Sequence, residues 1–251
     1  MQKKLWFGVY GKPYELDEPA FFDEDFPWKK VLEQRFQEIK SELEPLMQNG
    51  DGLQPYFDEG LQFPPRNWKT LSFLYWGVKT KTAESMPGLL SLLRDIPGLV
   101  NVSVSMLEPG SRILPHSGET NAVFRVHLGL EVPAGLPECG FKVREEMRPW
   151  QEGELLVFLD AHQHEAFNES NGRRYILLLD IMRPEFMHLQ RRVCVMALSI
   201  LSLYWVLAHI PRFPVEKLAA NSEKIPGWVI ATALLPFKCI WHVAFLLKRG
   251  R

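Results

Sequence analysis

The sequence has few cysteines and no motif built on them. Its three cysteines, Cys139, Cys194 and Cys239, lie far apart and form no Cys-x-x-Cys pair. This spacing excludes a recognisable disulfide framework or zinc ribbon, and a reducing compartment is the simplest inference. The N-terminus also lacks an apolar run of signal-peptide length, because two glycines and Pro13 interrupt it. We therefore expect the N-terminal body to stay in the cytoplasm.

The chain has almost no net charge, but its charges are unevenly distributed. The 251 residues include 29 Lys or Arg and 30 Asp or Glu, so nothing favours nucleic acid or another polyanion as a partner. From Met187 onward there are nine basic and two acidic residues, whereas the first 186 residues carry 20 and 28. Hydrophobic residues make up 46% of the chain, which is typical of a folded globular protein. These patterns predict an acidic folded body followed by a basic, apolar tail.

Apolar periodicity within the body changes from helical to strand-like. Residues 28–47 and 83–94 have apolar side chains at intervals of three and four, which predicts two amphipathic helices. Apolar residues then alternate with other residues over 102–106 and 123–129, as in strands. Further strands are predicted at 140–144, 155–159 and 174–180, between turn-forming residues. Successive short strands without intervening helices indicate a mainly β fold, a sandwich or jelly roll, with flanking helices.

Two apolar stretches lie in the C-terminal part. Residues 193–210 contain one ionisable side chain, a histidine, and are long enough to span a bilayer as a helix. Residues 226–247 include a lysine and a histidine, so this stretch is expected to span, to lie in the interface or to pack on the first. Basic residues at both outer ends favour a hairpin with cytoplasmic termini. We predict two domains, 1–186 and 187–251, the second a helical hairpin associated with the membrane through 193–247. A soluble helical pair that mediates dimerisation or covers the barrel is the alternative.

Two histidines and an arginine form the first candidate site. His116 and His164 stand beside turns at strand ends, a spacing that suits a metal site closed across a sheet fold. Imidazole binds iron, zinc, copper and nickel, and non-haem Fe(II) oxygenases use two histidines and one carboxylate on one face of the metal, with open coordination positions. Arg174 follows ten residues after His164 on a predicted strand, and its planar guanidinium suits bidentate binding of a carboxylate.

The segments around these residues resemble the aspartyl/asparaginyl β-hydroxylase family. The resemblance is carried by 116–121 (HSGETN), 125–130 (RVHLGL), 158–160 (FLD) and 180–185 (DIMRPE), and it extends over about residues 68–185. It implies a double-stranded β-helix, a cupin-like jelly roll. It also implies an enzyme that uses Fe(II), 2-oxoglutarate and O2 to insert one oxygen atom into an unactivated C–H bond, with release of succinate and CO2.

The resemblance also implies roles for individual residues. His116 and His164 match the iron ligands, and Arg174 matches the residue that pairs with the distal carboxylate of 2-oxoglutarate. The family positions that line the co-substrate pocket are Ser105, Arg125 and His127.

One position departs from the commoner iron site of this fold. Many relatives have Asp or Glu two residues after the first histidine, where this chain has Gly118. The hydroxylases that act on peptide side chains resemble it in this glycine, which implies that water fills the place. Three alternatives stay open: a carboxylate from Glu119 or Asp160, a halide that would support halogenation, and His162 as ligand in place of His164.

The acceptor substrate is predicted from two features that disagree. Bacterial members that hydroxylate acyl chains of lipid A or ornithine lipids resemble this chain in pairing the barrel with apolar helical segments, and residues 68–77 resemble their lysine-and-aromatic strand. Gly118 instead resembles the peptide hydroxylases. We predict a membrane-associated enzyme with its catalytic domain in the cytoplasm and a membrane-proximal substrate, with a lipid acyl chain favoured. The alternatives are β-hydroxylation of Asp or Asn in a peptide, and a catalytically silent membrane scaffold.

Overall fold

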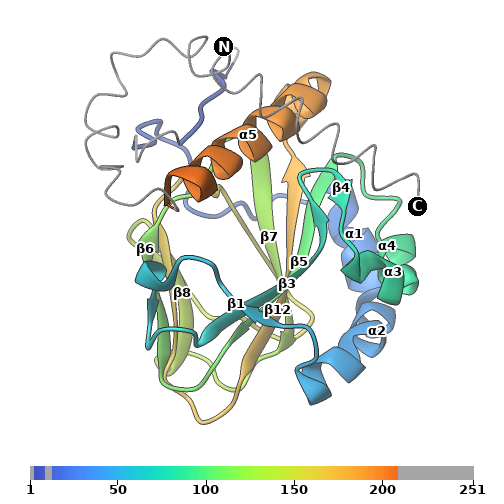
Figure 1. Cartoon of the computed structure of the whole chain (residues 1–251), viewed down its shortest axis with the longest axis vertical. Coiled ribbons are helices and arrows are strands. Elements are labelled where there is room, and N and C mark those ends of the chain that lie inside the picture. The colour runs from blue at the N-terminus through green and yellow to red at the C-terminus, as the bar shows by residue number, and fades with distance from the viewer. Residues whose placement is uncertain (1–2, 9–12, 209–251) are drawn as a thin grey trace.

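The computed structural model describes residues 3–8 and 13–208 and is built on two antiparallel sheets (Figure 1). In chain order the strands are β1 Gln54–Pro55, β2 Gln62–Phe63, β3 Trp68–Tyr75, β4 Val78–Lys79, β5 Leu99–Leu107, β6 Ser111–His116, β7 Val123–Glu131, β8 Cys139–Val143, β9 Glu146–Arg148, β10 Leu155–Phe158, β11 His164–Asn168 and β12 Arg174–Met182. A seven-stranded sheet has the order β1-β3-β5-β12-β7-β10, with β4 paired to β3. A five-stranded sheet has the order β2-β6-β11-β8-β9.

The connection between the sheets identifies the fold. From β5 to β12 the chain alternates between them: β5, β7, β10 and β12 belong to the seven-stranded sheet, and β6, β8, β9 and β11 to the five-stranded one. Eight antiparallel strands exchanged between two packed sheets in this way form a jelly roll, or double-stranded β-helix. The prediction of a mainly β jelly roll is therefore confirmed.

Strict alternation of side chains sets the two faces of the seven-stranded sheet. On β12, Tyr175, Leu177 and Leu179 belong to the apolar cluster beneath the helices, whereas Arg174 and Asp180 line a cavity on the opposite face. Strands β5 and β7 divide in the same way. Val102, Val104, Val126 and Leu128 join that cluster, whereas Ser103, Ser105, Arg125 and His127 line the cavity. The period of two therefore separates the stabilising face from the polar one.

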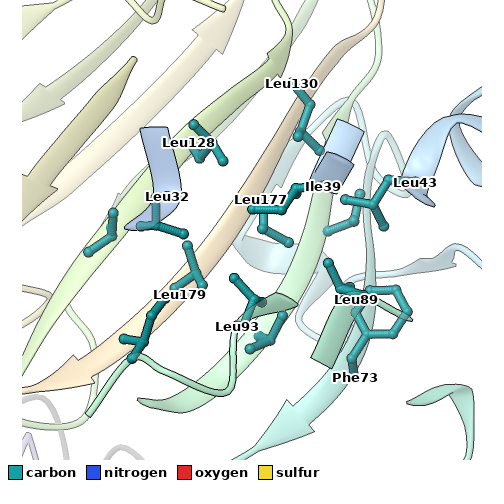
Figure 2. Packing of buried hydrophobic residues seen from close by; sticks show 14 of the residues in the cluster. Leu32, Ile39, Leu43, Phe73, Leu89, Leu93, Leu128, Leu130, Leu177 and Leu179 are labelled. Atoms are coloured by element: carbon teal, nitrogen blue, oxygen red, sulfur yellow. The ribbon is translucent and has the colours of Figure 1, made fainter. Parts of the chain in front are cut away.

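Helices cover the apolar face of this sheet. They are α1 Pro27–Gln34, α2 Phe36–Asn49, α3 Thr82–Ser85 and α4 Pro87–Leu92. Two 3-10 turns, η2 at Glu59–Leu61 and η3 at Pro184–Leu189, lie outside this cover. Figure 1 shows α1 to α4 on one side of the sheet and β6 and β8 on the other. Figure 2 shows the contact, where Leu32, Ile39 and Leu43 of the first two helices lie near Leu177 and Leu179. Every one of these side chains is buried.

Each of the two predicted helices in the body is divided. The stretch 28–47 forms α1 and α2, which meet at Arg35, a residue with non-helical backbone angles. The stretch 83–94 forms α3 and α4, because Pro87 begins α4 and disfavours the helical conformation in Met86 before it. Helix α2 ends at Gly50, whose φ of 70° gives the left-handed cap that glycine adopts most easily.

Helix α5, Gln190–Ala208, contains most of the first apolar stretch of the C-terminal part. Its buried residues Val193, Cys194 and Ala197 pack with Trp76 and Val100 of the body. Within residues 3–8 and 13–208, no helix is both long and apolar enough to cross a membrane. The predicted span at 193–210 therefore has no support in this part of the chain, and the second stretch, 226–247, lies outside the described residues.

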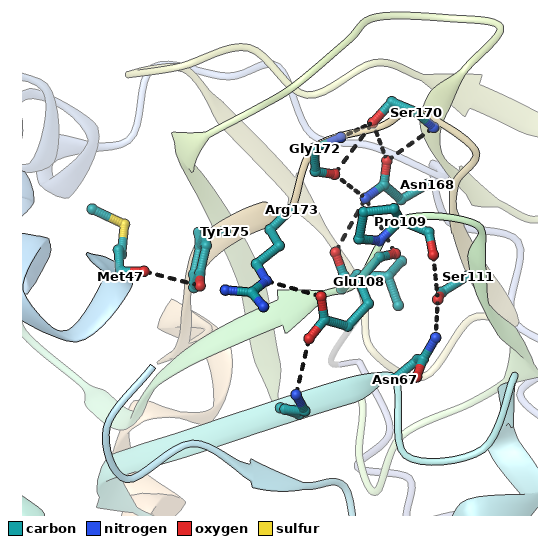
Figure 3. A network of polar contacts seen from close by, with 12 residues as sticks. Met47, Asn67, Glu108, Pro109, Ser111, Asn168, Ser170, Gly172, Arg173 and Tyr175 are labelled. Atoms are coloured by element: carbon teal, nitrogen blue, oxygen red, sulfur yellow. Dashed lines mark hydrogen bonds and ion pairs between the residues drawn. The ribbon is translucent and has the colours of Figure 1, made fainter. Parts of the chain in front are cut away.

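A polar network fixes the turn that leads into β12 (Figure 3). The side-chain amide of Asn168 donates to the carbonyl oxygens of Leu107 and Gly172, at 3.1 and 2.8 Å. Glu108 accepts from Lys69 and from Arg173, both at 2.9 Å. These contacts join β3, β5, β11 and β12 at one end of the barrel, and they hold the first residues of β12 in place.

Burial of the apolar face of the sheet leads to a prediction about stability. Leu177 is 0% exposed on the central strand β12, so Leu177→Ala should lower the free energy of unfolding by about 2–5 kcal/mol. Leu16→Ala is the control, because Leu16 is 46% exposed and its truncation should change that free energy by less than about 0.5 kcal/mol. Urea denaturation measures both, and equal losses would contradict this account of the core.

Candidate active site

A cavity of about 1790 Å³ lies against the polar face of the seven-stranded sheet. Its wall includes residues of β3, β5, β7 and β12 together with the end of β6 and the start of β11. All six residues predicted for the site line this one cavity: Ser105, His116, Arg125, His127, His164 and Arg174. Positions scattered over 70 residues of sequence are thus brought together by the jelly-roll crossings.

His116 and His164 face each other across neighbouring strands. They are paired in register between β6 and β11, and their ring centroids are 4.2 Å apart. Nδ1 of each ring lies 2.8 Å from a backbone carbonyl oxygen two residues earlier, that of Leu114 or of His162. A carbonyl can only accept, so Nδ1 carries the hydrogen in both rings. Each Nε2 therefore keeps its lone pair, which is the form that binds a metal.

Burial keeps both rings neutral. Loss of contact with water lowers the pKa of His116 to about 4. Burial also lowers the pKa of His164 well below its ordinary value, and His116 adds to this effect. Since a metal ligand must be unprotonated, the pair is in the competent state at neutral pH without first losing a proton.

His162, the alternative to His164, points elsewhere. Its ring packs 5.3 Å from that of Tyr14 in the N-terminal arm. The structure therefore pairs His164, and not its neighbour, with His116.

Arg174 is a buried charge without a carboxylate. It begins β12, is 1% exposed, and its Nε and Nη2 have no hydrogen-bond partner among the described residues. Its guanidinium carbon stacks 4.5 Å from the ring centroid of Trp150. Burial lowers its pKa to about 10, so it stays positive at neutral pH. An unpaired buried charge costs several kcal/mol, so this group is suited to an anion that enters the cavity.

Ser105 and His127 are buried beside tryptophans. The Ser105 hydroxyl accepts from Nε1 of Trp68 at 3.0 Å, and Nδ1 of His127 accepts from Nε1 of Trp150 at 3.4 Å. Burial, reinforced by the charge of Arg174, lowers the pKa of His127 well below its usual value. A neutral imidazole and a hydroxyl therefore accompany the guanidinium, and both can bond a polar ligand.

Gly118, where many relatives have a carboxylate ligand, lies against the side chain of Asp160. A Cβ on Gly118 would lie 1.5 Å from Oδ2 of Asp160, so only glycine leaves room for that side chain. Oδ1 of Asp160 lies 3.7 Å from Nε2 of His164. Glu119, the other carboxylate considered from sequence, also lines the cavity. Among the described residues, no three His, Cys, Asp or Glu side chains are grouped closely enough to hold a metal ion together.

Arg125 has partners that sequence reasoning missed. Its Nε and Nη2 donate to the two carboxylate oxygens of Asp180, at 2.7 and 2.8 Å, and its Nη1 donates to Asp160. Asp180 lies in the DIMRPE segment, and its even spacing from Arg174 already implied that both face the same side of one strand. The pairing itself needed the register of β12 against β7, which puts Asp180 opposite Arg125.

Comparison with known proteins gives the family. The sequence model described as "Aspartyl/Asparaginyl beta-hydroxylase" matches residues 33–184. The chain belongs to the aspartyl/asparaginyl β-hydroxylase family.

Relatives within the family act on different kinds of acceptor. The chain is 32% identical over 176 residues to the ornithine lipid ester-linked acyl 2-hydroxylase of Rhizobium tropici, covering 68% of this chain and 63% of that protein. It is 30% identical over 169 residues to the human aspartyl/asparaginyl beta-hydroxylase, covering 65% of this chain and 22% of that protein. The match thus spans less than two thirds of either relative. Among solved structures, a Pseudomonas putida prolyl-4-hydroxylase gives a TM-score of 0.40 at 13% identity, over 71% of this chain and 92% of that one.

The close contact between Gly118 and Asp160 leads to a prediction about stability. Gly118→Ala should lower the free energy of unfolding by about 1–3 kcal/mol, because the new methyl group displaces the Asp160 carboxylate. In an Asp160→Ala background the methyl group has room, so the loss caused by Gly118→Ala should largely disappear. Urea denaturation of the four proteins tests this. An undiminished loss in the double variant would show that another contact restricts position 118.

Proposed function

We propose that the protein is an Fe(II)- and 2-oxoglutarate-dependent hydroxylase whose acceptor is a membrane-proximal lipid acyl chain. The observation that carries the proposal is a buried, unpaired Arg174 in the same cavity as two neutral histidines with available Nε2 atoms. An anion-binding guanidinium beside a histidine pair fits a carboxylate co-substrate held next to a metal.

The residues fit each bound group. His116 and His164 would hold iron through Nε2, since both Nδ1 atoms are committed to backbone carbonyls. Arg174 would pair with the distal carboxylate of 2-oxoglutarate, which would satisfy its free donors. Ser105 and His127 would contribute further polar contacts. When bound, iron, 2-oxoglutarate and O2 supply the oxidising chemistry that hydroxylates a C–H bond and yields succinate and CO2.

The rings of Phe158 and Phe141 lie beside His164. The His164 ring lies 5.2 Å from that of Phe158 and 5.8 Å from that of Phe141, measured between centroids. These rings exclude water from one side of the histidine pair. Exclusion of water strengthens the electrostatic hold on bound groups and protects the reaction from side products.

A lipid acceptor is supported by the lining of the cavity away from Arg174. Leu74, Val78 and Leu178 provide apolar surface there, and the wall extends to Leu201 of the apolar helix α5. An acyl chain in this cavity would thus lie beside the C-terminal part. The Rhizobium tropici relative is named for acyl hydroxylation. As part of the proposal, residues 1–186 form the catalytic domain in the cytoplasm and 187–251 associate it with the membrane.

Hydroxylation of Asp or Asn in a peptide is the second candidate. It is favoured by the relationship to the human aspartyl/asparaginyl beta-hydroxylase and by Gly118, the feature in which the sequence resembles the peptide hydroxylases. A silent scaffold gains no comparable support, because the histidine pair and Arg174 are all retained in one cavity.

The acceptor is tested by succinate release from 2-oxoglutarate in the presence of Fe(II) and O2. Extracted membrane lipids should stimulate release by the full-length protein, whereas Asp- or Asn-containing peptides should not. His116→Ala and His164→Ala should abolish release, and His162→Ala is the matched control that should retain it. Stimulation by peptide alone would establish the second candidate, and absence of any His116-dependent succinate would overturn the enzyme assignment.

The role of Arg174 is tested by its affinity for 2-oxoglutarate. Arg174→Ala should raise the KM for 2-oxoglutarate about 100-fold, because it removes a buried charge-assisted contact. Arg94→Ala is the control, since the Arg94 side chain is 72% exposed and pairs with Asp95 outside the cavity. An unchanged KM in Arg174→Ala would show that the co-substrate carboxylate binds elsewhere.

A further inference from the structure

Asp180 holds Arg125 in a single orientation. Both oxygens of its carboxylate accept from the guanidinium, at 2.7 and 2.8 Å, in the bidentate geometry that fixes the plane of an arginine. Asp180 is itself fully buried, near the C-terminal end of β12. The ion pair between Asp180 and Arg125 is therefore largely out of contact with water, and dissolved salt screens its attraction only weakly.

Asn101 fixes Asp180 from the other side. Its Nδ2 donates to Oδ2 of Asp180 at 2.6 Å, and its Oδ1 accepts from the backbone N–H of Trp76 at 2.5 Å. The Asn101 amide is thus anchored to backbone at the β3–β4 turn. With partners on two sides, the Asp180 carboxylate cannot rotate without breaking buried hydrogen bonds.

Arg125 connects Asp180 to the histidine pair through the carboxylate of Asp160. Its remaining donor, Nη1, is bonded to Oδ1 of Asp160, and the same oxygen lies 3.7 Å from Nε2 of His164. The other oxygen of Asp160 has no hydrogen-bond partner among the described residues. Arg125 is therefore the side chain that sets the direction of the Asp160 carboxylate next to the histidines.

We propose that Asp180 is a positioning residue for the metal site, acting through Arg125 to hold the Asp160 carboxylate beside Nε2 of His164. This inference rests on the proposed function, because it assumes that a metal binds to the histidine pair. Groups behind the ligands commonly control metal affinity, and their loss costs about 10- to 100-fold. Asp180 touches neither histidine, so its effect depends on the intervening arginine and aspartate.

Asp180→Asn is the variant that breaks this connection. The amide has nearly the same shape, but it loses the negative charge and one of the two acceptors used by Arg125. The guanidinium then keeps Asp160 as its one carboxylate partner and is free to turn toward it. The Asp160 carboxylate should move relative to His164 as a result.

The experiment measures Co(II) binding to the full-length protein by absorption titration, without 2-oxoglutarate. Asp180→Asn should weaken Co(II) binding about 10-fold or more and alter the Co(II) spectrum. Asp23→Asn is the matched control, because Asp23 also receives a bidentate pair from an arginine, Arg148, at 2.5 and 3.0 Å, but on the surface. Its affinity and spectrum should equal those of the unaltered protein.

A double-mutant cycle separates positioning from a general loss of structure. In an Asp160→Ala background, Asp180→Asn should no longer change the Co(II) affinity, because the carboxylate that it positions is absent. An equal loss in both backgrounds would overturn the proposal. So would wild-type affinity and spectrum in a folded Asp180→Asn protein.

A second variant covers the case in which Asp180→Asn does not fold. Arg125→Lys keeps the charge but cannot bond to Asp160 and Asp180 together in the same geometry, so it should also weaken Co(II) binding about 10-fold. Unchanged binding in Arg125→Lys would overturn the proposal. Failure of the unaltered protein to bind Co(II) would instead refute the metal site itself, and with it the proposed function.

Discussion

Burial of one face of the seven-stranded sheet beneath helices α1, α2 and α4 is the constraint on which the site depends. Because side chains alternate along a strand, anchoring Leu177 and Leu179 under the helices commits Arg174 and Asp180 to the cavity. A register slip of one residue would exchange the two sets and would bury charges under the helices. The interactions that stabilise the fold therefore also determine which polar groups meet in its interior.

Arg125 and Arg174, which both line the cavity, have opposite electrostatic surroundings. Arg125 is compensated within the protein by Asp160 and Asp180, and these carboxylates raise its pKa further although burial opposes them. Among the residues that the structure describes, Arg174 stacks on the face of Trp150, and its Nε and Nη2 have no hydrogen-bond partner. A fold can keep an unpaired buried charge at a site where a bound ligand will pair with it. The stability of the core elsewhere offsets the free-energy cost of burying that charge. The contrast separates an arginine that organises the site from one suited to a ligand.

Sequence reasoning succeeded where the information was local. Alternation over 102–106 and 123–129 located β5 and β7, and the family resemblance named Ser105, Arg125 and His127 on them, which line the cavity. It failed where a result depended on register or on a single backbone break. The pairing of Arg125 with Asp180 arises from the alignment of β12 with β7, which no periodicity encodes. The break before Pro87 was visible in the sequence, but the apolar spacing continued through it and concealed the division.

The steric role of Gly118 changes what this residue says about the acceptor. As a feature of sequence, the glycine linked the chain to peptide hydroxylases. In the structure, position 118 is glycine because the Asp160 carboxylate occupies the space that a Cβ would need, close to His164. The glycine thus reports how the histidine pair is surrounded. In the proposed function, the acceptor lies instead against the distant wall of the cavity, whose lining includes Leu74, Val78, Leu178 and Leu201 of α5. The proposal of a lipid acceptor therefore rests on this apolar wall and not on Gly118.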